Sequence, residues 1–361
     1  MARLWTFGVV LIACVLATLG AGGILSGERC DKLEHCVHPS KCVETNNIIL
    51  RSAEFVTCNK FQVCCKALEK KEKPTPAPEL ENKWSQCGVI NKIGLQSVNL
   101  TSEEARPGEF PWVVAFYNKG QYIGAGSLVA PNIVLSAYHI MNDVSMEDLR
   151  IRAGDWDLNS DRESFQPQER SVIRIDGHED FYIRTGFSNL ALYFLDTPFQ
   201  LADHIRTMCL PDSPNAFTVD DCVMSGWGKK KFTDEHYSSV LKATQLPLVN
   251  TSDCEFLLRN TNLGNEFKLA EGLLCAGGNE NEDACTGDGG SSLFCPMTED
   301  PDRYVQVGIV NWGNGCGQRN VPGVYTDVFY FREWIRQKME EVPHFPPQPT
   351  VKPCRQMGDY R

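Results

Sequence analysis

The residues best suited to chemistry lie in the stretch 283–295, which reads D-A-C-T-G-D-G-G-S-S-L-F-C. It holds two carboxylates and two adjacent hydroxyls, Ser291 and Ser292, among glycines and cysteines. A hydroxyl that attacks a carbonyl needs a histidine to accept its proton and an aspartate to fix the imidazole tautomer. The first question is therefore whether this stretch carries such a nucleophile.

The stretch resembles the active-site loop of the chymotrypsin-type serine proteases, D-[SA]-C-x-G-D-S-G-G-P-L-x-C. The matching positions are Asp283, Cys285, Gly287, Asp288, Gly290, Leu293 and Cys295. Gly289 stands where the family has its nucleophilic serine, and glycine has no side-chain oxygen. His139, in A-Y-H-I, matches the family's histidine, whereas Asn189, in S-N-L-A-L, replaces its aspartate. The resemblance implies a degenerate triad and no catalysis.

Magnitudes support that interpretation. In a related triad, loss of the serine lowers turnover by about 10⁶, and an Asp→Asn change lowers it by about 10⁴. Attack requires an approach within about 3–3.5 Å, and small misplacements are costly. We expect Ser291 and Ser292 to pack locally, so an active serine endopeptidase is the least favoured function.

The fold class follows from short apolar runs separated by turn residues, which predict an all-β barrel or sandwich. The runs cover residues 112–117, 133–137, 189–194, 222–227, 305–312 and 324–328. Family motifs stand in order at 108–112 (G-E-F-P-W), 126–131 (G-S-L-V-A-P), 225–228 (S-G-W-G), 311–317 (N-W-G-N-G-C-G) and 322–326 (P-G-V-Y-T). They imply a chymotrypsin-like double antiparallel β-barrel. Helical spacing of Val328, Phe331, Trp334, Ile335 and Met339 predicts a C-terminal helix over 328–341, with this stripe in the core.

Composition and the N-terminus indicate a secreted globular protein. The 361 residues are 42% hydrophobic and 22% charged, and the net charge of −11 comes without a basic block. These features argue against nucleic acid or an anionic membrane as partner. Residues 1–22 resemble a signal peptide, with an apolar run shorter than the roughly 20 residues of a membrane span. We expect the mature protein in the extracellular fluid, without a membrane span.

Residues 28–66 hold six cysteines, which predict a small domain stabilised by disulfides, with a zinc site as the alternative. Spacing alone leaves the pairing open. The pattern C-x5-C-x5-C-x15-C-x5-C-C resembles the clip domain of arthropod serine proteases, which implies Cys30–Cys64, Cys36–Cys58 and Cys42–Cys65. Short strands are expected around Ile48, Leu50, Phe55 and Val56.

A charged, proline-rich linker at 67–86 separates this domain from the main domain at 87–341. Candidate processing sites for a trypsin-like enzyme are Arg51, Lys70, Lys71, Lys73 and Lys92. The family's activation cleavage would fall before residues 99–102, but Val98 precedes them, so a trypsin-like enzyme would not cut there. Asp288 is therefore expected to lack the ammonium partner that such cleavage supplies, leaving this region zymogen-like.

The resemblance also implies the disulfides of the main domain, namely Cys87–Cys209, Cys222–Cys295, Cys254–Cys275 and Cys285–Cys316. The family's bridge beside the histidine is missing, because Gly124 and Ile140 occupy its positions. Cys354 is left over in the proline-rich tail at 342–361. An intermolecular bridge to a second chain is one interpretation, and a capped, free or differently paired cysteine is the other.

The specificity pocket is better preserved than the triad. Asp283 stands where trypsin-like proteases hold the carboxylate that pairs with Arg or Lys, and Asn311, Gly313 and Gly323 complete that pocket. The alternative is an inherited pocket that has collapsed. The oxyanion-hole frame corresponds to Gly287 and Asp288.

Three further sites carry weaker signals. Asn99 and Asn250 begin glycosylation sequons. Asp155 and Glu169 are calcium candidates, although a plain acidic loop is favoured. No other metal or cofactor is expected.

Together these features resemble the clip-domain serine protease homologs of arthropod haemolymph. The resemblance implies a non-catalytic binding cofactor or regulator in an extracellular innate-immune protease cascade, that of prophenoloxidase activation and melanisation. Expected partners are clip-domain proteases, prophenoloxidase or other protease homologs. The alternatives are an adhesion or matrix protein and a negative regulator of melanisation.

Overall fold

The computed structural model describes residues 86–160 and 163–341, together with four short strands nearer the N-terminus. The chain divides into two units, residues 1–81 and 82–361. In the first unit β1 (Arg29–Cys30) pairs with β3 (Val56–Thr57), and β2 (Glu34–Val37) pairs with β4 (Val63–Lys66), both antiparallel. The signal segment, the clip disulfides, Arg51, the linker lysines and Cys354 lie outside the described residues.

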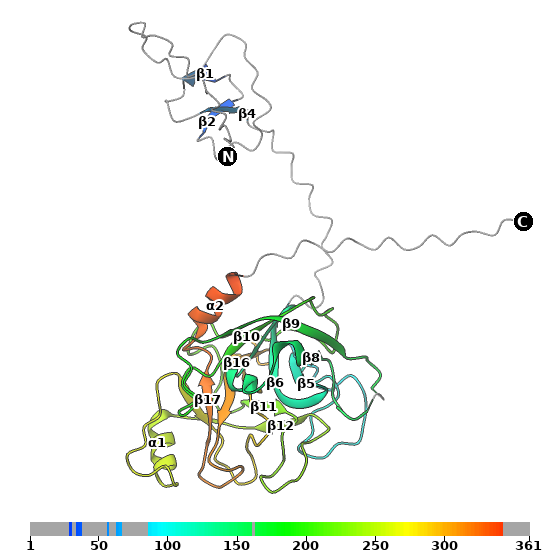
Figure 1. Ribbon diagram of the computed structural model, residues 1–361, viewed down its shortest axis with the longest axis vertical. Coiled ribbons are helices and arrows are strands. Elements are labelled where there is room, and N and C mark those ends of the chain that lie inside the picture. Colours follow the sequence, from blue (N-terminus) through cyan, green and yellow to red (C-terminus); the bar gives the residue numbers. More distant parts are fainter. Residues whose placement is uncertain are drawn as a thin grey trace, which may run out of the picture. The chain divides into compact units, whose positions relative to one another are not determined.

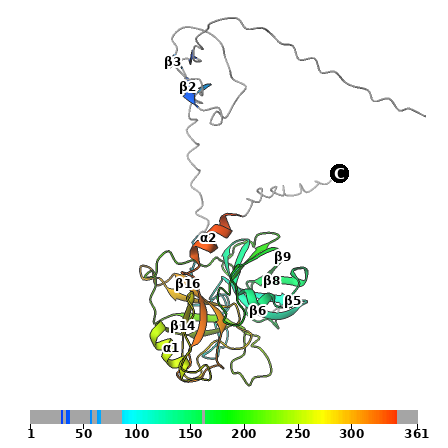
Figure 2. The same ribbon diagram turned by 60° about the vertical axis from the view of Figure 1, so that its left-hand side comes forward.

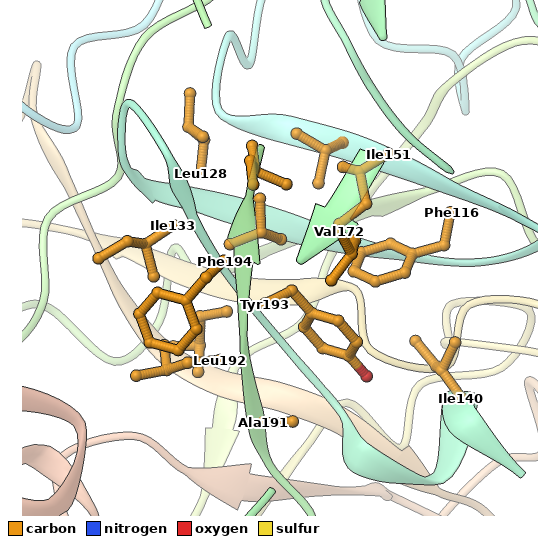
Figure 3. Packing of buried hydrophobic residues seen from close by; sticks show 14 of the residues in the cluster. Phe116, Leu128, Ile133, Ile140, Ile151, Val172, Ala191, Leu192, Tyr193 and Phe194 are labelled. Atoms are coloured by element: carbon orange, nitrogen blue, oxygen red, sulfur yellow. The ribbon is translucent and has the colours of Figure 1, made fainter. Parts of the chain in front are cut away.

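Six antiparallel strands of the second unit form a closed barrel in the order β10-β7-β6-β5-β8-β9. Their bounds are Val113–Asn118 (β5), Gln121–Ala130 (β6), Ile133–Ser136 (β7), Leu149–Ala153 (β8), Gln168–Gly177 (β9) and Ala191–Leu195 (β10). The β5–β6 hairpin turns through Lys119 and Gly120, whose positive φ values of 51° and 79° suit the twist of a two-residue hairpin. Figure 3 shows Phe116, Leu128, Ile151 and Tyr193 converging inside this barrel.

The remaining strands form a second antiparallel sheet in the order β12-β11-β15-β16-β17-β14-β13. Their bounds are Val223–Gly226 (β11), Lys242–Gln245 (β12), Leu248–Val249 (β13), Leu273–Ala276 (β14), Ser292–Pro296 (β15), Tyr304–Trp312 (β16) and Gly323–Asp327 (β17). Figures 1 and 2 show the two barrel-like sheets packed together. This is the chymotrypsin-like double β-barrel, so the predicted fold class is confirmed.

Helices are few and short in the part of the chain that the structure describes. They are the 3₁₀ turns η2 (Tyr138–Met141) and η3 (Met146–Asp148) and the α-helices α1 (Thr251–Arg259) and α2 (Arg332–Glu340). The C-terminal helix begins later than the predicted position 328, because the Asp327 side chain accepts the N–H groups of Phe329 and Tyr330 and holds a turn there. Val328, Phe331 and Ile335 are buried, as the stripe predicted. Within the described residues no helix has the length and apolar character needed to cross a bilayer.

Four disulfides join described residues of the second unit, and they are the pairs that the resemblance implies: Cys87–Cys209, Cys222–Cys295, Cys254–Cys275 and Cys285–Cys316. At the site of the missing bridge, a Cβ added to Gly124 would lie 3.0 Å from Ile140 Cδ1. The two positions are therefore neighbours, and the isoleucine side chain fills the space beside the glycine.

Candidate functional site

The three degenerate triad positions meet where the two barrels face each other. His139 lies in η2 after β7, Asn189 precedes β10, and Gly289 lies in the loop before β15. The backbone N–H of His139 donates to Asn189 Oδ1 at 3.0 Å, and Asn189 Nδ2 lies 2.8 Å from His139 Nδ1. The fold thus preserves the arrangement of a triad although two of its functional groups are gone.

The asparagine fixes the histidine in the wrong tautomer for catalysis. Asn189 Nδ2 also donates to Asn311 Oδ1 at 2.7 Å, and Asn311 Nδ2 donates to the carbonyl of Gly186 at 2.7 Å. These bonds orient both amides, so His139 Nδ1 must accept and the ring proton must reside on Nε2. Burial lowers the pKa of His139, which favours the neutral ring. An Nε2 that carries a proton cannot accept one from a nucleophile.

The imidazole also occupies the space of the missing side chain. A Cβ built on Gly289 would lie 2.7 Å from His139 Nε2 and 3.2 Å from Cε1, well inside ordinary contact distances. Ser291 and Ser292 are fully buried, with 0% exposure, so neither hydroxyl reaches a peptide bound in the cleft. The structure agrees with the expectation that these serines pack locally.

Beside this blocked position lies an open cavity of about 230 Å³. Asp283, Asn311, Gly313 and Gly323 all line it, together with His139 and Gly289. The sequence prediction placed the first four in one pocket, and the structure brings them together. We name this cavity the Asp283 pocket.

The wall of the Asp283 pocket is polar and incompletely satisfied. Asp283 Oδ2 accepts from the backbone N–H of Gly317 at 3.0 Å, whereas Asp283 Oδ1 and the Tyr325 hydroxyl are buried and find no hydrogen-bond partner among the residues that the structure describes. A Cβ on Gly323 would lie 3.1 Å from Asp283 Oδ1 and 3.3 Å from that hydroxyl, so both oxygens face the same small residue. Burial raises the pKa of Asp283 to about 6. Such a site favours a ligand that brings positive charge and several N–H donors.

The oxyanion-hole frame, Gly287 and Asp288, is held by contacts from both sides. The Tyr122 hydroxyl donates to the Gly287 carbonyl at 2.9 Å, and the Asp288 N–H donates to the Cys285 carbonyl at 2.9 Å. Gly287 has φ of 94°, and a Cβ there would meet the Tyr237 ring at 2.6 Å. Only glycine fits this turn.

Asp288 pairs with a lysine ammonium, and not with the N-terminal ammonium that cleavage would supply. Lys242 Nζ, at the start of β12, donates to Asp288 Oδ2 at 2.8 Å, and the side chains are only 4% and 0% exposed. Nothing in the sequence singles out Lys242, because a lysine in a short strand usually marks a solvent-facing position. Its one unusual feature is its place between Leu241 and Ala243, both of them apolar.

The weaker predicted sites fall in different places. Asp155 and Glu169 both pair with Arg152, at 3.3 and 3.2 Å, so a calcium ion there would have to displace the guanidinium. Across residues 86–160 and 163–341, no three His, Cys, Asp or Glu side chains cluster as metal ligands would. The sequon residues Asn99 and Asn250 are both exposed. Lys92 is exposed and pairs with Asp302.

Comparisons with known proteins agree with this geometry. The trypsin family model matches residues 100–335, so the chain belongs to the trypsin family. It is 40% identical over 281 residues to phenoloxidase-activating factor 2 of Galleria mellonella, covering 73% of this chain and 92% of that protein. It is 36% identical over 306 residues to inactive CLIP domain-containing serine protease A8 of Anopheles gambiae, covering 82% and 83%. Inactive CLIP domain-containing serine protease A28 of the same mosquito is 35% identical over 303 residues, covering 79% and 78%. Within its family the chain is a clip-domain serine protease homolog, as the sequence predicted.

Proposed function

We propose that this protein is a secreted, non-catalytic cofactor or regulator in an extracellular immune protease cascade, that of prophenoloxidase activation and melanisation. The main support for a binding role without catalysis comes from the cleft. The His139 ring fills the nucleophile position, while the Asp283 pocket stays open. Relatives named phenoloxidase-activating factor 2 and inactive CLIP domain-containing serine proteases support the choice of cascade. The proposed organisation is a clip domain at 28–66 joined by the linker at 67–86 to the protease-like domain at 87–341.

The pocket suggests how a partner is recognised. An arginine or lysine side chain that enters it would bring N–H donors and positive charge to Asp283 Oδ1 and the Tyr325 hydroxyl, which otherwise remain unsatisfied. We therefore propose that an exposed basic residue of a haemolymph protein docks here. The partner is a clip-domain protease, prophenoloxidase or another protease homolog.

A second hollow of about 610 Å³ adjoins the Asp283 pocket and shares His139, Asn311 and Trp312 with it. Its other lining residues include the apolar side chains Ile183, Leu263 and Phe267. It would receive the residues next to the docked basic side chain, so an extended segment is the fitting ligand. Because no nucleophile is present, that segment stays uncut and the complex persists.

The test is a reconstituted mixture of prophenoloxidase and its activating protease, assayed with and without this protein. The wild type is expected to change phenoloxidase activity, Asp283→Asn to abolish that effect, and Asp212→Asn, an exposed aspartate, to retain it. An unchanged effect in Asp283→Asn would remove the pocket from the proposal. Lower activity with the wild type would identify a negative regulator, and inhibitor-sensitive hydrolysis by the pure protein would overturn the non-catalytic role.

A further inference from the structure

A buried ion pair fixes the loop that forms one wall of the Asp283 pocket. Asp288 is fully buried, and its flanking residues Gly287 and Gly289 both line the pocket. Its carboxylate accepts the N–H of Gly228 at 2.7 Å and that of Cys285 at 2.9 Å. Lys242 Nζ completes the set at 2.8 Å. The position of Asp288 therefore determines where this wall stands.

Lys242 is equally committed to this arrangement. Besides Asp288, its Nζ donates to the backbone carbonyl of Lys229 at 2.8 Å. The ammonium is thus surrounded by a carboxylate and a carbonyl, as a buried cation requires. Lys230, the residue after Lys229, is a contrasting case. Its ammonium is exposed and lies 3.5 Å from the Glu103 carboxylate at the surface.

The chain segment that could have supplied an N-terminal ammonium instead runs along the outside of β12. Asn99 and residues 101–103 are exposed. The Glu103 carbonyl accepts the N–H of Ala243 at 2.9 Å, and Glu104 forms a β-bridge with Lys242. The backbone of Lys242 therefore contacts this uncut segment, while the lysine side chain reaches inward to Asp288.

We propose that Lys242 is a built-in counter-ion that holds the Asp283 pocket in its binding shape without cleavage of the chain before Asn99. The ammonium belongs to a strand, so it is in place as soon as the barrel folds. Without it, the buried carboxylate would be left uncompensated and would move toward water or take up a proton, carrying Gly287 and Gly289 with it. Lys242 acts as a positioning residue, since it lies behind the pocket wall and touches no ligand.

This inference deepens the proposed function, because it makes pocket competence independent of processing. A cut at Lys92 or in the linker would then control which surfaces a partner reaches, rather than whether the pocket exists. The role of Lys242 rests on the proposed function only because binding in the Asp283 pocket is what the experiment measures.

The test measures binding of the fluorescent probe p-aminobenzamidine, a small cationic amidine, to the full uncut chain. Wild type is expected to bind before any proteolysis. Lys242→Met is expected to bind more weakly by about tenfold or more. Lys230→Met, the matched surface control, is expected to bind like wild type. A folded Lys242→Met that binds like wild type overturns the inference, and circular dichroism checks the fold.

The double variant Lys242→Met/Asp288→Asn separates the charge from the packing. It removes both charges of the pair, so neither is left uncompensated, and the variant is expected to fold and to bind the probe better than Lys242→Met alone. A folded double variant without probe binding overturns the counter-ion role, even where the single variant fails to fold. Uncut wild type that does not bind also overturns it. If the probe then binds after limited proteolysis, the proposed function stands without the counter-ion role. If the probe never binds, the counter-ion role and the proposed docking in the Asp283 pocket both fail.

Discussion

At the scale of single residues, three separate features of the cleft oppose catalysis. Gly289 provides no nucleophile, Asn189 selects the wrong imidazole tautomer, and the His139 ring occupies the space for a side chain at position 289. The first two losses were predicted from sequence, because residue types alone reveal them. The third was not, since the position of a ring depends on the packing around it.

Restoring the serine alone is expected to fail. In Gly289→Ser the new side chain meets the His139 ring, and the proton on Nε2 prevents general-base action. Adding Asn189→Asp restores the tautomer and should raise hydrolysis of an arginine ester above the single variant by about 10² or more. Fluorophosphonate labelling and ester turnover measure this, with Asn189→Asp alone as control. Efficient labelling of Gly289→Ser alone would contradict the assigned tautomer.

Binding in the Asp283 pocket should depend on pH. Burial raises the pKa of Asp283 to about 6, and a cationic probe prefers the ionised carboxylate. The affinity for benzamidine is therefore expected to fall as the pH drops from about 7 to about 5. Fluorescence titrations across this range measure it. Asp283→Asn should bind weakly at every pH, and a flat profile in the wild type would count against the pocket carboxylate as the binding group.

The same carboxylate should reduce stability at neutral pH. Its folded pKa of about 6 lies above the ordinary 3.8, so the native state holds the proton more tightly than the unfolded chain. Its contribution to the free energy of unfolding falls as the pH rises between these values. Asp283→Asn is expected to be more stable than wild type by about 3 kcal/mol at pH 7, since the pKa shift of about 2 units corresponds to about 1.4 kcal/mol per unit. The advantage should disappear near pH 4, and urea unfolding at both pH values checks it.

At the scale of elements, sequence patterns predicted where strands lie better than they predicted which side chains pair with each other in space. The runs at 133–137 and 305–312 became β7 and β16 almost unchanged, because continuous apolar runs bounded by turn residues leave local signals. Helix α1 was not predicted, since its sequence is mostly polar and only Cys254 and Leu258 are buried. The Lys242–Asp288 pair was missed because its partners lie far apart in the chain.

Helix α1 gives a test at this scale. Asn250 Oδ1 accepts the N–H of Asp253 at 3.0 Å and caps the helix, while the same residue begins a sequon. Asn250→Ala is expected to lower the free energy of unfolding by about 1 kcal/mol. Asn250→Asp keeps the cap and removes the glycan acceptor, and Ser252→Ala removes the sequon alone. Mass spectrometry of secreted protein and thermal unfolding separate the two roles, and equal stability of Asn250→Ala and Asn250→Asp would exclude the cap.

At the scale of the whole molecule, Lys92 is the one predicted processing site among the described residues. It is exposed and is followed by Ile93, which is 89% exposed, so the bond between them is accessible to a trypsin-like protease. Limited proteolysis is expected to cut here and in the linker. Because Cys87 is bonded to Cys209, protein cut only after Lys92 should run as a single band without reductant, and reductant should release its N-terminal fragment. A cut in the linker falls before Cys87, so it should release its fragment without reductant.

The matched variant Lys92→Gln should lose only the cut at this bond, as N-terminal sequencing of the reduced fragments would show. A fragment that contains Cys87, ends at Lys92 and separates without reductant would contradict the Cys87–Cys209 bond. Fragments produced only from the interior of the barrels would contradict accessibility at Lys92.

The position of Cys87 before Lys92 has a consequence for avidity. After the cut, the N-terminal region and the barrels remain covalently tethered through Cys209, so neither dilutes away from the other. For short flexible connections the effective local concentration is on the order of millimolar. A partner bound by one half would therefore meet the other half at that concentration, however scarce the protein is in the surrounding fluid.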